Sequence, residues 1–206
     1  INDFGGAIPK IQNDSTNAQT VDMSFRLSGV GNTVASGNRA GELNPINGDL
    51  IFTPNCTIGI VSNTELRFYS APGFTDYVYG PITNTVPTNT CALMTAGSGG
   101  FGATVVFFNS HTFTNTFINN GTVRLATNNV TPAPITIGDT NLNNAAAILR
   151  MDNGFSNGSP LVIKAGSTNS RTIGNTAIGS GDALFAGPIS LGTNLFQSQN
   201  GKLGML

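Results

Sequence analysis

The sequence has few charged residues, one histidine, no tryptophan and only two cysteines. Charged residues make up 9% of the 206 residues, whereas an average globular domain has about 25%. The Lys and Arg residues are scattered and form no basic stripe, so we expect no nucleic-acid partner. The low charge density also means weak repulsion between copies, which favours self-association.

Long apolar runs are missing too. No stretch approaches the roughly 20 consecutive apolar residues that a transmembrane helix needs, so we expect no membrane span. The chain opens at Ile1 without a methionine, as a processed or trimmed product would. This is compatible with a secreted protein.

The sequence lacks recognisable catalytic and metal-binding motifs. Ser98 lies in a Gly-Ser stretch rather than in a nucleophile elbow, and His111 stands alone, so we do not expect a catalytic triad. Two isolated cysteines and one histidine do not supply the spaced ligands of a zinc site. Acidic residues mostly stand in turn-like stretches such as Asp152-Asn153-Gly154, which favours turn chemistry over calcium binding. We predict a protein that is not an enzyme and has no cofactor or metal; polysaccharide cleavage by a carboxylate pair is a third, less favoured interpretation.

Small polar residues dominate what is present. Gly, Asn, Thr and Ser suit short strands joined by tight turns and are weak helix formers. Thr20–Leu27 alternates apolar and polar residues, which predicts a strand with one wet face. Further strands are predicted at Glu65–Tyr69, Asp76–Tyr79 and Ala147–Met151. We therefore predict a nearly all-β protein.

The chain divides near the flexible stretch Gly97-Ser98-Gly99-Gly100. Residues 1–100 contain proline-rich turns and predict a β-sandwich-like N-terminal part. Residues 101–206 contain short apolar couplets between turns and predict a β-solenoid-like part, that is, a parallel β-helix. A single continuous two-layer structure is the alternative. A cluster of phenylalanines in residues 101–117 is interpreted as core, with an exposed seam between subunits as the alternative.

Three motifs carry a resemblance to a known family: Gly121-Thr-Val-Arg-Leu125, Ser170-Arg-Thr-Ile-Gly-Asn175 and Gly181-Asp-Ala-Leu-Phe-Ala-Gly-Pro-Ile-Ser-Leu191. Over residues 119–206 the chain resembles the autotransporter-associated β-strand repeats of large secreted bacterial surface proteins. The resemblance implies a right-handed parallel β-helix, export across an envelope, and a role in adhesion or as a surface stalk. Residues 1–100 depart from the family pattern.

The two cysteines, Cys56 and Cys91, predict one disulfide and hence an oxidising, extracellular compartment. Two buried free thiols are the first alternative. A bridge between neighbouring subunits is the second.

These observations predict a structural subunit of an extracellular surface assembly, such as a filament, sheath or adhesin stalk. The subunit would form a homopolymer by edge-strand pairing. Its apolar C-terminal end would be covered by the next subunit or continue into a longer protein. The predicted interface comprises Val21, Met23, Phe25, Leu27, Leu203, Met205 and Leu206. The alternative is a carbohydrate-binding module of a larger adhesin, with surface glycans bound on a platform of Tyr69, Tyr77 and Tyr79.

Overall fold

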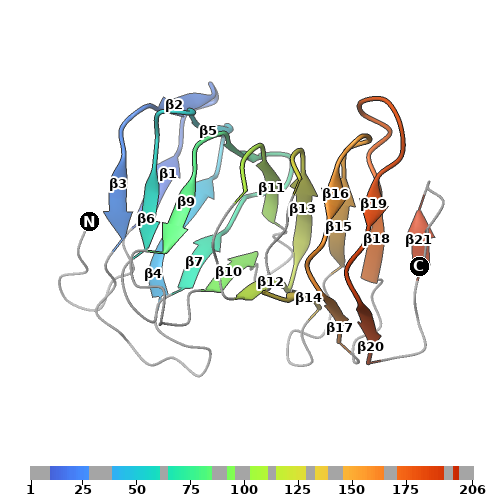
Figure 1. The fold of residues 1–206 in the computed structure, drawn as a ribbon. Coiled ribbons are helices and arrows are strands. Elements are labelled where there is room, and N and C mark those ends of the chain that lie inside the picture. The colour runs from blue at the N-terminus through green and yellow to red at the C-terminus, as the bar shows by residue number, and fades with distance from the viewer. Residues whose placement is uncertain are drawn as a thin grey trace.

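All regular secondary structure in the described residues is β-strand (Figure 1). The computed structural model describes residues 10–27, 39–60, 65–84, 92–95, 103–110, 115–128, 133–138, 146–164, 171–192 and 197–199. The all-β prediction is thereby confirmed for the described part of the chain. No helix in that part is long and apolar enough to cross a membrane.

Two eight-stranded sheets run through the molecule, and every strand pair in them is parallel. The first sheet consists of β1 (Lys10–Asn13), β4 (Arg39–Pro45), β7 (Glu65–Phe68), β10 (Ala92–Thr95), β12 (Asn115–Ile118), β14 (Ile135–Ile137), β17 (Leu161–Ile163) and β20 (Ile189–Leu191). The second sheet consists of β2 (Gln19–Val21), β5 (Leu50–Phe52), β8 (Asp76–Val78), β11 (Ala103–Phe107), β13 (Gly121–Leu125), β15 (Ala147–Met151), β18 (Arg171–Asn175) and β21 (Gln197–Gln199).

Two shorter sheets complete the described structure. The third sheet consists of β3 (Phe25–Leu27), β6 (Ile58–Ile60) and β9 (Ile82–Asn84), and a two-stranded sheet consists of β16 (Ser156–Asn157) and β19 (Leu184–Phe185). Each of these strands follows a strand of the second sheet in the chain. The chain therefore passes through the sheets in a fixed order, and each strand pairs with the one that enters the same sheet on the next pass.

The N-terminal part differs from the β-sandwich-like arrangement predicted for it. A sandwich is built mainly from antiparallel neighbours, whereas the described strands from β1 onward pair in parallel. Alternating apolar and polar residues are compatible with both arrangements, because the alternation reports one buried face and not the strand's partner. The ladders also continue across the predicted boundary at residues 97–100, since β8 pairs with β11 and β10 with β12.

The predicted strand Thr20–Leu27 is two strands separated by a corner. β2 ends at Val21 and β3 begins at Phe25, so the chain passes from the second sheet to the third. Met23 lies in the corner and is 72% exposed, while Leu27 points into the core at 1%. The apolar Met23 continues the sequence alternation through the corner although its side chain is exposed there, which is why the sequence reads as one strand.

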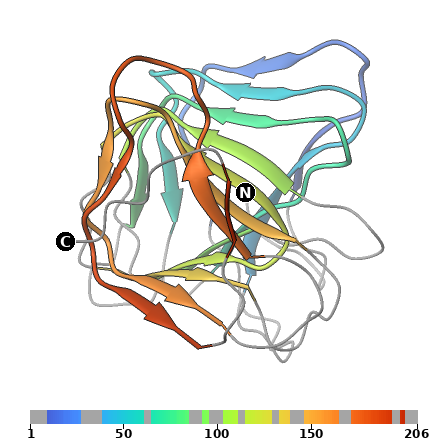
Figure 2. The same cartoon turned by 90° about the vertical axis from the view of Figure 1, so that its right-hand side faces the viewer.

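The inward-facing side chains form one continuous core. The strands are arranged around this interior, as the view along the molecule shows (Figure 2). Because the register is kept from strand to strand, Phe52, Val78, Phe107 and Leu125 follow one another along the interior. Each fully buried side chain of this size contributes roughly 1.5–3 kcal/mol. Phe107 is 1% exposed and meets Phe68 edge-on at 5.6 Å. The core interpretation of the phenylalanine cluster holds for Phe107.

Candidate functional site

The outward-facing residues of the second sheet form a continuous row across the strands. Strict register places Ile51, Tyr77, Val106, Arg124 and Arg150 side by side, one from each of five successive strands. Neighbouring strands lie about 4.8 Å apart. The row, called here the outer row, changes from apolar and aromatic to cationic along the sheet. Val106 at its centre is buried at 3% exposure, and the other four side chains are half-buried.

A second row follows at the ends of the same strands. Backbone hydrogen bonds from Tyr79 N–H to Phe52 O and from Phe108 N–H to Val78 O, both 2.9 Å, continue the ladder by one residue. They bring the Tyr79 and Phe108 rings into a stack with centroids 4.1 Å apart and planes 8° apart. Tyr79 is 37% exposed. The two rings thus pack face to face on the side of the sheet that carries Tyr77.

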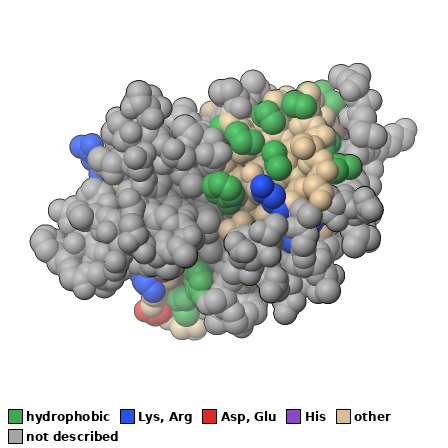
Figure 3. All heavy atoms as spheres, turned by 90° about the horizontal axis from the view of Figure 1, so that it is seen from below, with side chains coloured by type: hydrophobic (Ala, Val, Ile, Leu, Met, Phe, Trp, Pro, Cys, Tyr) green, Lys and Arg blue, Asp and Glu red, His purple; other side chains and the backbone are tan. Residues whose placement is uncertain are grey.

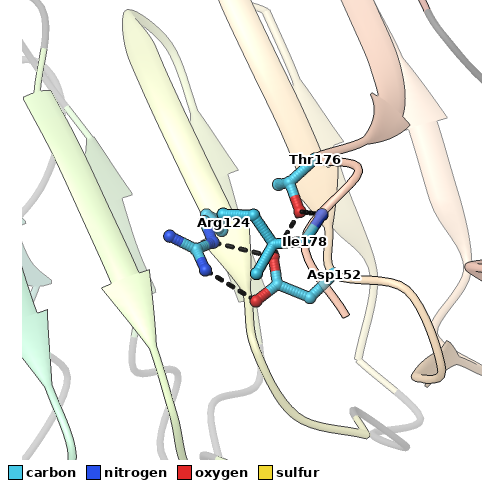
Figure 4. A network of polar contacts seen from close by, with 4 residues as sticks. All are labelled: Arg124, Asp152, Thr176 and Ile178. Atoms are coloured by element: carbon cyan, nitrogen blue, oxygen red, sulfur yellow. Dashed lines mark hydrogen bonds and ion pairs between the residues drawn. The ribbon is translucent and has the colours of Figure 1, made fainter. Parts of the chain in front are cut away.

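Further along the same ends of the second-sheet strands, Asp152 holds Arg124 in a bidentate ion pair (Figure 4). Arg124 Nε donates to Asp152 Oδ1 and Nη2 donates to Oδ2, each at 2.7 Å. Thr176 Oγ1 donates to Asp152 Oδ1 at 2.6 Å and accepts the N–H of Ile178 at 3.2 Å. Paired charge-assisted bonds of this kind fix the orientation of a guanidinium. The network thus ties β13, the turn after β15 and the turn after β18 together.

Arg124 and Asp152 stabilise each other in their ionised forms. Burial by itself raises the pKa of the Asp152 carboxyl, but hydrogen bonds from Arg124 and Thr176 and the charge of Arg124 outweigh it and leave that pKa below its ordinary value. The hydrogen bond to Asp152 raises the pKa of Arg124 above its ordinary value, although burial opposes the rise. The register places Arg124 beside Val106, which in turn lies beside Tyr77.

Arg150 is the next residue of the outer row and differs from Arg124. It is half-buried, and its guanidinium has no hydrogen-bond or ion-pair partner among the described residues. One guanidinium of the row is therefore held in place by a carboxylate, and the next has no such partner in the described part of the chain.

The structure brings together two of the three tyrosines predicted as a glycan platform. Tyr77 and Tyr79 lie on the second sheet, whereas Tyr69 continues the first sheet with a 2.9 Å bond from its N–H to Leu43 O. The sequence analysis missed Phe108 and the arginines of the outer row. Finding them requires the register between strands that are distant in the chain, because a parallel pair is joined by a crossover of about a dozen residues or more.

The predicted assembly residues fall into different places. Val21 and Phe25 are half-buried and face inward at the first pass of the chain, where Phe25 packs against Phe52 with ring centroids 6.1 Å apart. Leu27 belongs to the core, and Met23 is exposed at the corner. Leu203, Met205 and Leu206 lie outside the described residues.

The sheets end at β1 and β2 on one side, and the backbone there has a free edge among the described strands. Gln19 N–H donates to Asp49 O at 3.0 Å, and Val21 O accepts from Thr53 N–H at 3.1 Å. In a parallel pair, alternate residues direct their N–H and C=O to opposite neighbours. The N–H and C=O of Thr20 therefore point away from β5, toward the free edge.

The opposite edge is formed by β20 in the first sheet. Gly192 N–H donates to Ile163 O at 2.7 Å and Leu161 N–H donates to Pro188 O at 2.8 Å. By the same alternation, Ile189 and Leu191 direct their N–H and C=O away from β17. Leu191 occupies an inward-facing position beside Ile163 yet is 57% exposed. Among the described strands, none covers the core beyond β20 in this sheet.

Cys56 lies in the corner between β5 and β6 as a free, buried thiol. Its sulfur contacts Met23 O at 3.3 Å. Burial raises the pKa of the thiol to about 11, and the nearby charge of Asp22 contributes to the rise. The structure gives no support to the disulfide predicted with Cys91, which lies outside the described residues. A buried free cysteine and a disulfide-bonded cysteine are the same letter in the sequence. The presence of two cysteines therefore could not distinguish a free thiol from a disulfide.

Asp76 is a fully buried carboxyl in the interior. Asp76 is 0% exposed and takes an inward-facing position between Leu50 and Val105. Ser70 Oγ lies 3.1 Å from Asp76 Oδ2 and 3.3 Å from Thr104 O. Burial raises the pKa of Asp76 well above its ordinary value; the bond with Ser70 opposes the rise and the charge of Asp49 adds to it.

The other residues considered for chemistry give no site in the described part of the chain. Ser98 and His111 lie outside it, and Asp152 is engaged by Arg124. No group of three or more His, Cys, Asp or Glu side chains in the described ranges could hold a metal ion. Comparison with known proteins yields no matching family model, no matching curated protein and no matching solved structure.

Proposed function

We propose that the chain is a β-solenoid subunit of a secreted surface assembly and that it polymerises head to tail. The observation that carries this proposal is the free edge that the described strands leave at each end of the parallel sheets. Such an interface is heterologous, and a heterologous contact that does not close into a ring generates a filament.

The two edges have matching backbone groups. Inward-facing residues of both long sheets direct their N–H and C=O to the following strand, as Gln19 and Ile163 do. Leu191 would therefore pair with Ile11 of the next copy, which faces the core beside Leu43 and directs its own groups to β4. In this register the hydrogen bonds and the inward-facing rows continue together from one copy to the next.

Burial supplies the favourable free energy of this contact. Leu191 and the half-buried Ile189 lie at one end, and the half-buried Ile11, Val21 and Phe25 lie at the other. Each is an inward-facing side chain that a neighbour's strand would cover. Covering apolar surface gains about 25 cal/mol per Å², and the ladder bonds provide direction.

A proline at Thr20 tests the proposal without disturbing the subunit. The Thr20 N–H points to the free edge, so the T20P variant loses no described hydrogen bond within the chain, and proline is tolerated at such positions of edge strands. We expect the variant to keep its circular dichroism spectrum and to need a roughly tenfold or higher concentration to polymerise. The matched control, T20A, keeps the N–H and should polymerise like the unmodified chain.

Electron microscopy and sedimentation velocity at matched concentrations give the measurement. Filaments from the unmodified chain and T20A, with T20P remaining monomeric, agree with the proposal. Filaments from T20P at the same concentration, or a monomeric unmodified chain at every concentration, contradict it.

A further inference from the structure

We propose that the outer face of the second sheet around Tyr77, Arg124 and Arg150 binds an acidic polysaccharide. This is a second function, which does not depend on polymerisation, because the face lies along the side of the sheets and the free edges lie at their ends. Figure 3 views the molecule from below, from the side of β14, β17 and β20 in Figure 1, and shows hydrophobic side chains gathered beside Lys and Arg on one part of that surface.

The aromatic end of the face offers a surface for sugar rings. The Tyr79 and Phe108 rings stack nearly parallel with their centroids 4.1 Å apart, and Tyr79 is 37% exposed. A stacked pair is rigid and presents an apolar body with the polar tip of Tyr79. The C–H groups of a sugar ring pack against apolar faces, and its hydroxyls need hydrogen-bond partners at the rim.

The cationic end supplies those partners and selects for charge. A guanidinium has five N–H donors, and Arg124 uses two of them on Asp152. The remaining donors of Arg124 are held in a fixed orientation at no further cost in side-chain entropy. Arg150 lies next to Arg124 in register, and within the described ranges its guanidinium has no hydrogen-bond partner. Two guanidiniums against one carboxylate leave the site positive, and a planar guanidinium matches a carboxylate bidentately.

The geometry of the row favours an extended chain over a small molecule. The residues come from successive strands about 4.8 Å apart, so the aromatic and cationic parts follow one another along the sheet. A uronic-acid polymer carries ring faces and carboxylates in repeated alternation. It can therefore contact Tyr79 with one unit while a neighbouring carboxylate meets Arg124 or Arg150.

Titration calorimetry with polygalacturonate oligomers tests this inference, with dextran as a neutral polymer and an oligo-dT strand as a different polyanion. T20P serves as the background, so that polymerisation does not enter the measurement. We expect binding to polygalacturonate that weakens with added salt, and a roughly tenfold loss in R150Q and in Y79A. The control K164Q removes one exposed charge elsewhere and should bind normally.

The possible outcomes separate clearly. Selective binding that R150Q and Y79A weaken and K164Q does not supports the acidic-polysaccharide site. Equal losses in R150Q and K164Q, equal affinity for dextran or oligo-dT, or no binding to polygalacturonate overturns it. Loss of filaments in T20P alongside retained polygalacturonate binding would show that the two functions are separate.

Discussion

Replacing Asp76 by asparagine should make the protein more stable at neutral pH. The geometry around the carboxyl suits its protonated form. The single hydroxyl proton of Ser70 can be donated either to Asp76 Oδ2 or to Thr104 O, which lie at 3.1 and 3.3 Å. If Oδ2 carries a proton and donates to Ser70 Oγ, Ser70 is free to donate to Thr104, and both contacts are hydrogen bonds. The D76N amide can make the same donation without taking up a proton.

The sign of the pH dependence follows from the raised pKa. The unfolded chain loses the Asp76 proton near the ordinary value of 3.8, whereas the folded chain keeps it to a higher pH. The folded state then binds more protons, so stability falls as the pH rises from 3.8 to the folded-state pKa. The fall is about 1.4 kcal/mol per pH unit within that window. The D76N variant lacks this term.

Relief of a poorly paired buried group is worth about 1–3 kcal/mol, and we expect the D76N variant to gain this much at pH 7. For a chain of this length the gain corresponds to roughly 2–4 °C in Tm per kcal/mol. Urea unfolding of T20P and of T20P with D76N, from pH 3.5 to 8, gives the measurement on a non-polymerising background. The two curves should converge near pH 3.5 and separate above it. Parallel curves across the whole range, or a less stable D76N variant at pH 7, would refute the reasoning.

Two further predictions concern Asp152 and Cys56. The D152N substitution should lower the free energy of unfolding by about 1–3 kcal/mol at pH 7. Because the folded-state pKa of Asp152 is lowered, this difference should be complete above pH 3.8 and shrink as the pH falls below it. Urea unfolding at pH 7 and below pH 3.8 checks both statements. Cys56, buried with a pKa of about 11, should react with a thiol reagent at pH 8 only after denaturation, and mass spectrometry of the unreduced, denatured chain should find it labelled; a bridged Cys56 would contradict the structure.

Local strand positions could be predicted from the sequence, because alternation and turn residues act over a few positions. Ala147–Met151 is a strand with the predicted bounds, and the strands predicted at Glu65–Tyr69 and Asp76–Tyr79 each extend one residue beyond the observed ones. The pairing of these strands could not be predicted. Alternation states which side chains are buried and carries no information on which distant strand provides the next ladder.

The candidate site was predictable only where it is local. Tyr77 and Tyr79 are two residues apart, so any strand through them directs both to the same face. Arg124, Arg150 and Phe108 join them only because β8, β11, β13 and β15 keep one register. Tyr69 is near in sequence but lies on the first sheet, because the chain turns a corner at Ser70–Thr75.

The two proposed functions would reinforce each other through geometry. Head-to-tail stacking repeats the face around Arg124 and Arg150 once per subunit along the filament, since the strand register fixes its position relative to the edges. A long acidic polysaccharide could then contact several copies at once, and the second contact is intramolecular, which raises the overall affinity without any new interaction. R150Q should therefore weaken each contact and leave filaments intact, whereas T20P should leave the single-site affinity unchanged and remove only the gain from repetition. Measuring the affinity of the same variants for short and for long polygalacturonate separates these effects. Only the filament should bind the long polymer more tightly than its larger number of binding units accounts for.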